Sequence, residues 1–208
     1  MKNLLLTVIF LFLSVLAIAQ KEINTEFATK MNLAFQPLEK NRVPFGLLKD
    51  QAFEFTELAA YNGVVTDTNY VTPVTIKQIY NTLLSARIHD NASQFIQPDV
   101  YEQRWQANRT QGVITLSGLL FNYAQFKTDA VTSGKLQVIN NQLKDKYIGA
   151  TWQNPYDTKL TFAIAPSVRK HKGYTFSIKI PSNLWLTNVT ETIQSIQIDA
   201  NDGLGYRT

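Results

Sequence analysis

A short basic cluster is the first feature of this sequence that could contact a ligand. Arg169, Lys170, His171 and Lys172 follow one another directly, between two segments typical of β-strands. Cationic and titratable side chains gathered on one loop can bind an anionic glycan, a lipid headgroup or an acidic protein surface. The alternative interpretation is a solvated loop tip without a ligand. We therefore take these four residues as candidate ligand contacts.

Aromatic pairs are the second candidate. Trp152 and Tyr156 flank an Asn-Pro pair in a stretch typical of a loop, and Tyr101 and Trp105 lie four residues apart. Exposed rings of this kind stack on sugar faces or insert into a partner protein, although buried rings are more often packing residues. Trp152 and Tyr156 therefore join the candidate ligand contacts, with a glycan or a protein as the expected ligand.

An acidic, glycine-containing stretch, Asp199–Gly205, has oxygen-bearing side chains that could bind calcium. The EF-hand pattern requires Gly at its sixth position, but here Gly203 falls at the fifth and Leu204 at the sixth. The alternative is a tight turn between strands, in which Asn and Asp make local hydrogen bonds and Gly adopts positive φ. We favour the turn and expect no metal.

Motifs for the common enzyme chemistries are missing from the sequence. It contains no Gly-x-Ser-x-Gly nucleophile elbow, no phosphate-binding glycine loop and no cysteine. Its two histidines, His89 and His171, are too far apart in sequence to indicate a zinc site, and His89 fits the C-terminal end of a helix. We therefore predict no catalytic residue, no cofactor and no turnover on ester, glycoside or peptide substrates by this segment alone.

The N-terminus has the three regions of a secretory signal peptide. Lys2 is followed by an apolar run from Leu4 to Leu16, and Ala17-Ile18-Ala19 provides small residues at a cleavage site before Gln20. The run is shorter than the roughly 20 residues that a membrane span needs. We predict a signal peptide over residues 1–19 and export to the periplasm, the outer surface or the medium.

Composition favours a folded bacterial exported chain. Hydrophobic residues make up 45% and charged residues 17%, and the formal charge of +4 is too small to indicate nucleic acid as a partner. The absence of cysteine excludes disulfide staples and a lipoprotein anchor. No segment after the signal peptide predicts a transmembrane span. The three Asn-x-Ser/Thr sequons, at Asn91, Asn108 and Asn188, are interpreted as chance occurrences.

Residues 20–95 are predicted to be helical. Apolar residues recur at helical spacing from Phe27 to Leu38, and a second helix is predicted from Leu48 to about Gly63. A third is predicted to start at Pro73, with Thr72 as its N-cap and with a buried stripe of Ile76, Ile79, Tyr80 and Leu83.

Residues 96–208 are predicted to form an antiparallel β-rich, sandwich-like part. Val113–Tyr123 has apolar residues on both faces and predicts a strand covered on both sides. Residues after Leu136 are expected to form a hairpin around Asn140-Asn141. Lys159–Ala165 and Tyr174–Ile180 are predicted to pair, burying four apolar residues on one face: Phe162, Ile164, Phe176 and Ile178. A further strand is expected to begin at Ile196. The fold class is therefore α+β.

Two stretches resemble known proteins. Val43–Asp50 leading to Tyr61-Asn62-Gly63 resembles the start of large, mostly uncharacterised exported proteins of Bacteroidota. Ile196–Asp199 with Asp202-Gly203 and Gly205–Arg207 is similar to the turn that follows a strand in PKD-like and other immunoglobulin-like modules, with Asn201 in place of a motif Gly. The resemblance implies a multidomain surface or secreted protein and implies no reaction.

The leading hypothesis is therefore the N-terminal segment of an exported cell-surface or secreted protein that binds or presents a ligand. Its partners would be a glycan or protein ligand and the downstream domains of the same polypeptide, because Ile196–Ile198 otherwise has an unpaired edge where the sequence stops. The alternative is an accessory region of a secreted esterase or glycan-degrading enzyme with its catalytic domain beyond Thr208. The third hypothesis is a purely structural module.

Overall fold

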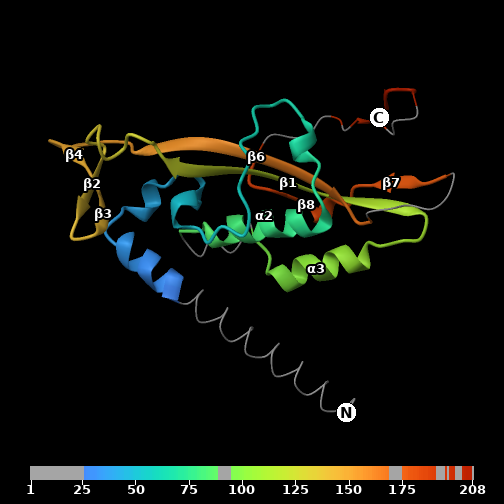
Figure 1. Ribbon diagram of the computed structural model, residues 1–208, viewed down its shortest axis with the longest axis horizontal. Coiled ribbons are helices and arrows are strands. Elements are labelled where there is room, and N and C mark those ends of the chain that lie inside the picture. Colours follow the sequence, from blue (N-terminus) through green and yellow to red (C-terminus); the bar gives the residue numbers. More distant parts are fainter. Residues whose placement is uncertain are drawn as a thin grey trace, which may run out of the picture.

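The computed structural model describes residues 26–88, 95–168, 175–190, 195, 197–199 and 203–207. Figure 1 shows two long strands, β1 (Val113–Phe126) and β6 (Tyr156–Pro166), running the length of the molecule, with helices α2 (Pro73–Ser85) and α3 (Pro98–Ala107) beside one face. The α+β class predicted from the sequence is confirmed. The helices found among the described residues are not long and apolar enough to cross a membrane.

Strand β1 organises the sheet because both of its edges are paired. On one edge β6 runs antiparallel to it, from Leu116 opposite Pro166 to Phe126 opposite Tyr156. On the other edge lie β7 (Ser177–Lys179) and β8 (Trp185–Thr187), both parallel to β1, with the short 3-10 helix η5 (Ser182–Leu184) between them. The chain therefore changes from one edge of β1 to the other between β6 and β7.

The predicted hairpin of Lys159–Ala165 with Tyr174–Ile180 is therefore wrong. Both stretches contain strands, but each pairs with β1 and not with the other. Period-2 alternation identifies a strand without naming its partner. A strand as long as β1 offers two edges to segments that are distant in sequence.

The predicted buried face of that hairpin is also wrong. The side chains of β6 that pack into the core are the small residues Thr161, Ala163 and Ala165, which let α2 lie close to the sheet. Phe162 and Ile164 point to the opposite face and are half-buried, and Phe176 and Ile178 are 44% and 36% exposed. The residues of β6 alternate as predicted, but the side of the strand with the bulkier side chains is the one that faces away from the core.

The helical region follows the local signals in part. Residues 26–34 are helical, as predicted, and α2 starts at Pro73 with the Thr72 hydroxyl accepting the Thr75 N–H at 3.1 Å. The apolar stripe predicted for α2 is buried. Helix α3 was not predicted, and its start at Pro98 follows the same rule of proline at the first helical position.

The helix predicted from Leu48 to Gly63 does not form. Only a 3-10 turn, η3 (Lys49–Gln51), is present there, and the chain then runs extended. The N–H groups of Phe55 and Thr56 donate to the Thr82 hydroxyl of α2, at 3.0 and 3.3 Å. Tertiary hydrogen bonds thus replace the helical ones that the apolar spacing indicated.

Small hairpins and turns complete the fold. The predicted hairpin is confirmed as β2 (Leu136–Ile139) with β3 (Gln142–Asp145), and Asn140 and Asn141 have φ of 51° and 61°. The remaining short elements are β4 (Tyr147–Ile148) with β5 (Thr151–Trp152), β9 (Ile198–Asp199) with β10 (Tyr206–Arg207), and the 3-10 turns η1 (Lys40–Arg42), η2 (Pro44–Gly46) and η4 (Asp67–Asn69).

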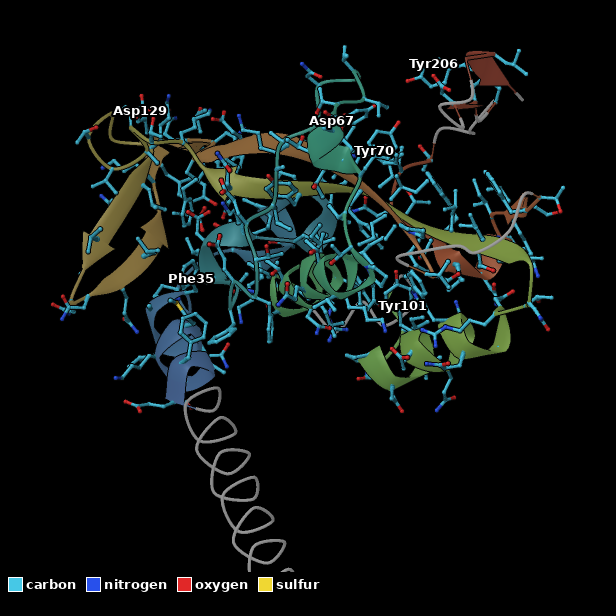
Figure 2. The ribbon with its side chains drawn as sticks, turned by 45° about the vertical axis from the view of Figure 1, so that its right-hand side comes forward. Phe35, Asp67, Tyr70, Tyr101, Asp129 and Tyr206 are labelled. Atoms are coloured by element: carbon cyan, nitrogen blue, oxygen red, sulfur yellow. The ribbon has the colours of Figure 1, made fainter. Side chains whose placement is uncertain are left out.

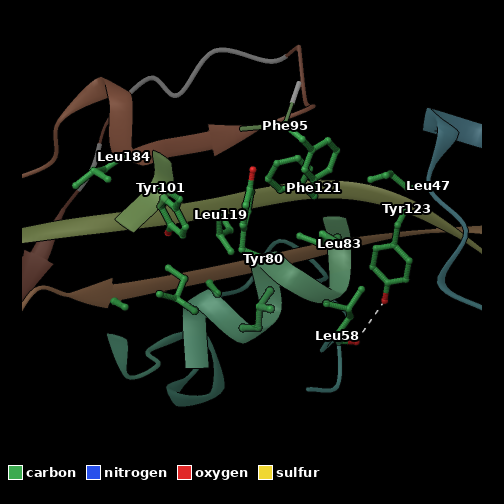
Figure 3. Packing of buried hydrophobic residues seen from close by; sticks show 14 of the residues in the cluster. Leu47, Leu58, Tyr80, Leu83, Phe95, Tyr101, Leu119, Phe121, Tyr123 and Leu184 are labelled. Atoms are coloured by element: carbon green, nitrogen blue, oxygen red, sulfur yellow. Dashed lines mark hydrogen bonds between the residues drawn. The ribbon is translucent and has the colours of Figure 1, made fainter. Parts of the chain in front are cut away.

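One core joins the segments on either side of residue 95. Figure 3 shows α2 packed on β1, with Phe95 stacked on Phe121 at 5.2 Å and the Tyr123 hydroxyl donating to the Leu58 carbonyl at 3.3 Å. The buried members of this core are Leu47, Leu58, Ile76, Ile79, Tyr80, Leu83, Phe95, Tyr101, Trp105, Leu119, Phe121, Tyr123, Ala163, Ala165 and Leu184. The predicted helical and β-rich regions therefore share their hydrophobic interior.

Candidate functional site

The basic cluster Arg169, Lys170, His171 and Lys172 lies outside the described residues, and so does His89. The Asp199–Gly205 stretch is described only at its ends, where Ile198–Asp199 pairs antiparallel with Tyr206–Arg207 and Gly203 has φ of 80°. This pairing is what a turn between two strands requires. No cluster of His, Cys, Asp or Glu suited to a metal ion occurs in the described part of the chain.

Trp152 and Tyr156 are packing residues and not a surface platform. Tyr156 is 3% exposed and stacks on Phe126 at 5.4 Å. Trp152 donates its indole N–H to Asp145 at 2.6 Å, and the Arg42 guanidinium lies 5.0 Å above its ring. Arg42 therefore occupies one face of the Trp152 ring, and the burial of Tyr156 corrects the expectation that its ring is an exposed contact.

The second aromatic pair is also internal. Tyr101 and Trp105 are both buried under the sheet, and the Tyr101 hydroxyl lies 2.7 Å from the Ser117 hydroxyl. The four-residue spacing that suggested a pair of exposed rings is the inner stripe of α3.

A groove on the opposite face of the sheet is the strongest candidate site. Its floor is formed by half-buried apolar side chains of β1 and β6, among them Leu116, Leu120, Phe162 and Ile164. The groove has a volume of about 690 Å³. That lies in the range of about 300–1,000 Å³ that is usual for ligand sites.

Trp185 of β8 lies across the groove floor because Gly118 leaves room for it. Gly118 is opposite Trp185 in the parallel register of β1 and β8, and a Cβ at residue 118 would overlap the six-membered part of the indole ring. The ring is 6.2 Å from that of Phe162 on the far side of β1. A glycine inside the strand thus makes the site possible by allowing this close approach.

One wall of the groove is the segment 61–71, which precedes α2. It is hydrogen-bonded to the edge of β6 that does not pair with β1. The Tyr61 N–H donates to the Leu160 carbonyl at 2.6 Å, and the Val71 N–H donates to the Ile164 carbonyl at 2.9 Å. Between them, the Asn69 side chain donates to the Phe162 carbonyl at 2.9 Å. These bonds hold the Tyr61 ring 5.2 Å from Phe162 and place Val65 and Tyr70 along the rim.

The C-terminal segment forms another part of the rim. Ser195, Gln197, Asp199 and Tyr206 line the mouth of the groove, and Figure 2 shows Tyr70 above the sheet while Tyr101 lies beneath it. Partial burial raises the pKa of the Tyr70 hydroxyl, and the nearby Tyr206 hydroxyl raises it further. The two rims therefore meet through tyrosine side chains.

Neither a family model, nor a curated protein, nor a solved structure matches this chain. The residues that line the groove are therefore the evidence for what it can bind. Among the lining residues that the structure describes, Asp199 alone carries a formal charge, and the floor contains no hydroxyl or thiol nucleophile. The floor therefore offers apolar contacts, whereas the polar lining groups, among them Ser195 and Asp199, belong to the rims.

A second cleft, of about 710 Å³, lies between the 26–34 helix, η3 and the end of β1. Its charged groups already have structural partners. The Asp50 carboxylate accepts the Phe126 N–H at 2.8 Å, Lys49 pairs with Glu54 at 3.2 Å, and the Lys127 ammonium donates to the Asn154 carbonyl at 3.1 Å. The groove on the sheet is the better candidate because its apolar side chains remain accessible.

Two sequons also have structural roles. The Asn188 side chain pairs with the backbone of Asn122, accepting its N–H at 2.7 Å and donating to its carbonyl at 2.8 Å, so it continues the edge of the sheet after β8. The Asn108 side chain donates to the Arg104 carbonyl at the end of α3, at 2.9 Å. Both side-chain amides are therefore hydrogen-bonded within the protein.

Proposed function

We propose that the protein is exported and acts as a non-enzymatic binding unit whose sheet groove holds an apolar ligand. The observation that carries this proposal is the row of half-buried Leu116, Leu120 and Ile164 beside Trp185, on a sheet whose other face is buried in the hydrophobic core. Exposed apolar area gathered in a concavity marks a binding site more often than scattered exposed residues do.

The lining favours apolar protein side chains over a glycan as the ligand. A sugar needs several hydrogen-bonding groups around its ring, whereas the polar groups of this groove lie along its rims and its floor is aliphatic and aromatic. Tryptophan and tyrosine are also enriched where proteins bind one another. We therefore expect an apolar segment of a partner protein to occupy the groove.

Placing a cation on the groove floor should weaken binding of an apolar probe. Nile red, an uncharged dye, serves as the probe, and Leu120→Arg is the variant. We expect its dissociation constant to rise at least about tenfold, because binding would bury an unpaired guanidinium. Val74→Arg, on the exposed side of α2, is the matched control and should bind as the wild type does. Equal binding by all three proteins would place the dye elsewhere and contradict the proposal.

Gly118→Ala is a second variant that tests the groove, and this substitution adds no charge. Its new methyl group must push the Trp185 ring into the groove, so dye binding should weaken and the tryptophan emission should shift. The strain should cost about 1–3 kcal/mol of unfolding free energy, which urea titration measures independently of the dye. Unchanged emission together with full binding would show that the ring does not lie over residue 118.

Export has its own test at the N-terminus. The signal-peptide pattern of residues 1–19 supports it, as does the resemblance to exported proteins of Bacteroidota. Intact-mass analysis of the protein from an exporting bacterial host should find a chain that begins at Gln20, cyclised to pyroglutamate or not. A chain that still carries Met1 in a host that processes its own signal peptides would contradict export by this route.

A further inference from the structure

Two hairpins at one end of the molecule expose aliphatic side chains at their tips. Val138 and Ile139 end strand β2 and are 55% and 46% exposed, and Ile148, beside the turn between β4 and β5, is 65% exposed. Figures 1 and 2 both show the β2–β3 hairpin at the end of the molecule opposite β7 and α3, and in Figure 1 β4 lies beside it. These side chains line neither the groove on the sheet nor the second cleft.

The 26–34 helix reaches the same end. The Gln142 side chain donates to the Leu33 carbonyl at 3.0 Å, and Gln142 lies opposite Ile139 in the hairpin register. Leu33 is itself exposed. The apolar tip of the first hairpin therefore continues onto the helix, and we call Leu33, Val138, Ile139, Tyr147 and Ile148 the hairpin end.

The charge next to these side chains is positive. Lys144 and Lys146 have no ion-pair partner among the described residues, and Lys135 is 3.9 Å from Asp129. The carboxylate between the two lysines, Asp145, is buried, where it accepts the Trp152 indole N–H and the Glu39 backbone N–H, each at 2.6 Å. The hairpin end thus combines exposed aliphatic groups with unpaired cations.

The backbone of these hairpins is paired up to the turns. Strands β2 and β3 pair at four positions up to the Asn140-Asn141 turn, and β4 and β5 pair up to the turn at Gly149. Water is scarce in the hydrocarbon core of a bilayer but present among its headgroups, so the outward-facing backbone groups of these two-stranded hairpins can stay hydrated there. The Tyr147 hydroxyl donates to the Glu39 carboxylate, whose charge is paired with Arg42 at 2.6 Å.

We propose that the hairpin end docks on the surface of an anionic lipid bilayer. Val138, Ile139 and Ile148 would enter the headgroup region, while Lys144 and Lys146 contact anionic headgroups. A bilayer is favoured over a protein partner because the surface is made of separate projecting tips, which a soft layer can accept without a matching cavity. Positive charge beside the apolar tips complements anionic headgroups. The proposal is independent of ligand binding in the groove.

Vesicle sedimentation tests this proposal with the protein as secreted, its N-terminus verified by mass. We expect the wild type to bind phosphatidylcholine vesicles that contain about 30% phosphatidylglycerol, and to bind pure phosphatidylcholine far more weakly. Lys144→Gln and Lys146→Gln should each lower the partition coefficient about fivefold at low salt, and added salt should have the same effect. The double variant Val138→Asn/Ile148→Asn should lower it at least about tenfold.

The control double variant Val64→Asn/Val74→Asn removes two equally exposed apolar side chains outside the hairpin end and should bind vesicles as the wild type does. Thermal melting verifies that each variant is folded, and Nile red binding should persist in the hairpin variants. The proposal is overturned if the wild type does not sediment with anionic vesicles or if both double variants bind equally. It is also overturned if the hairpin substitutions abolish only self-association, which would make this end a protein interface.

Discussion

Replacing Phe121 by alanine should lower the free energy of unfolding by about 3–5 kcal/mol, the range for a fully buried phenylalanine. The Phe121 ring is inaccessible to solvent and stacks on Phe95, between the central strand and the helices. Its removal would leave a cavity that strand β1, paired along both edges, cannot close by moving. Urea titration of the wild type and the variant measures the difference directly.

Phe176→Ala is the matched comparison, because it makes the same chemical change on a ring that is 44% exposed. We expect a loss below about 1.5 kcal/mol, since much of that ring already contacts water. The two substitutions distinguish the pairing of both segments with β1 from a buried hairpin between the segments themselves. If Phe176→Ala proved the more damaging of the two, the 159–165 and 174–180 segments would form the buried hairpin that alternation alone suggested.

Elements whose signals are local could be predicted from the sequence. Thr72-Pro73 defines the start of α2 because the cap and the proline act within one helical turn. Asn140-Asn141 defines the β2–β3 turn because two adjacent residues must adopt positive φ. In both cases the residues that form the structure are also neighbours in the chain.

Elements that depend on distant partners were not predictable in the same way. The 48–63 segment has helical spacing, but Thr82 lies on a helix that the sequence does not place beside it, and its hydroxyl takes the N–H groups of Phe55 and Thr56. Likewise, nothing within Ser177–Lys179 indicates that β1, and not β6, is its partner. Local propensity describes what a segment can form, and the competing tertiary bonds decide what it forms.

The groove was missed for the same reason. The sequence pattern places Leu116 and Leu120 on one face of a strand and Phe162 and Ile164 on one face of another, but it predicts that both of these faces are covered. The small side chains of Ala163 and Ala165 against α2 show which side of β6 the helix occupies. A signal was present in Gly118, since a glycine inside an otherwise apolar strand indicates close approach of another group. Only the pairing of β8 with β1 identifies that group as Trp185.

Raising the pH above 10 should destabilise the protein more steeply than its surface lysines alone would explain, because tyrosines are buried in the main core, among them Tyr80 and Tyr123. Burial raises the pKa of Tyr80 to about 12 and that of Tyr123 to about 12. In the unfolded chain both would ionise near pH 10. The unfolded state therefore releases these protons first, and the stability that is complete below about pH 10 is lost as the pH rises toward about 12.

Each of the two tyrosines should remove about 1–2 kcal/mol over that interval, after allowance for partial solvent screening. Tyr123→Phe is the informative variant because its hydroxyl makes one long bond, to the Leu58 carbonyl at 3.3 Å. At pH 7 the variant should lose about 1 kcal/mol or less, and above about pH 11 it should equal or exceed the wild type in stability. Urea titrations at a series of pH values measure the crossover. If the free energy of unfolding changed with pH in the same way for both proteins, the Tyr123 hydroxyl would be in contact with water. The extended 52–58 segment would then not cover it.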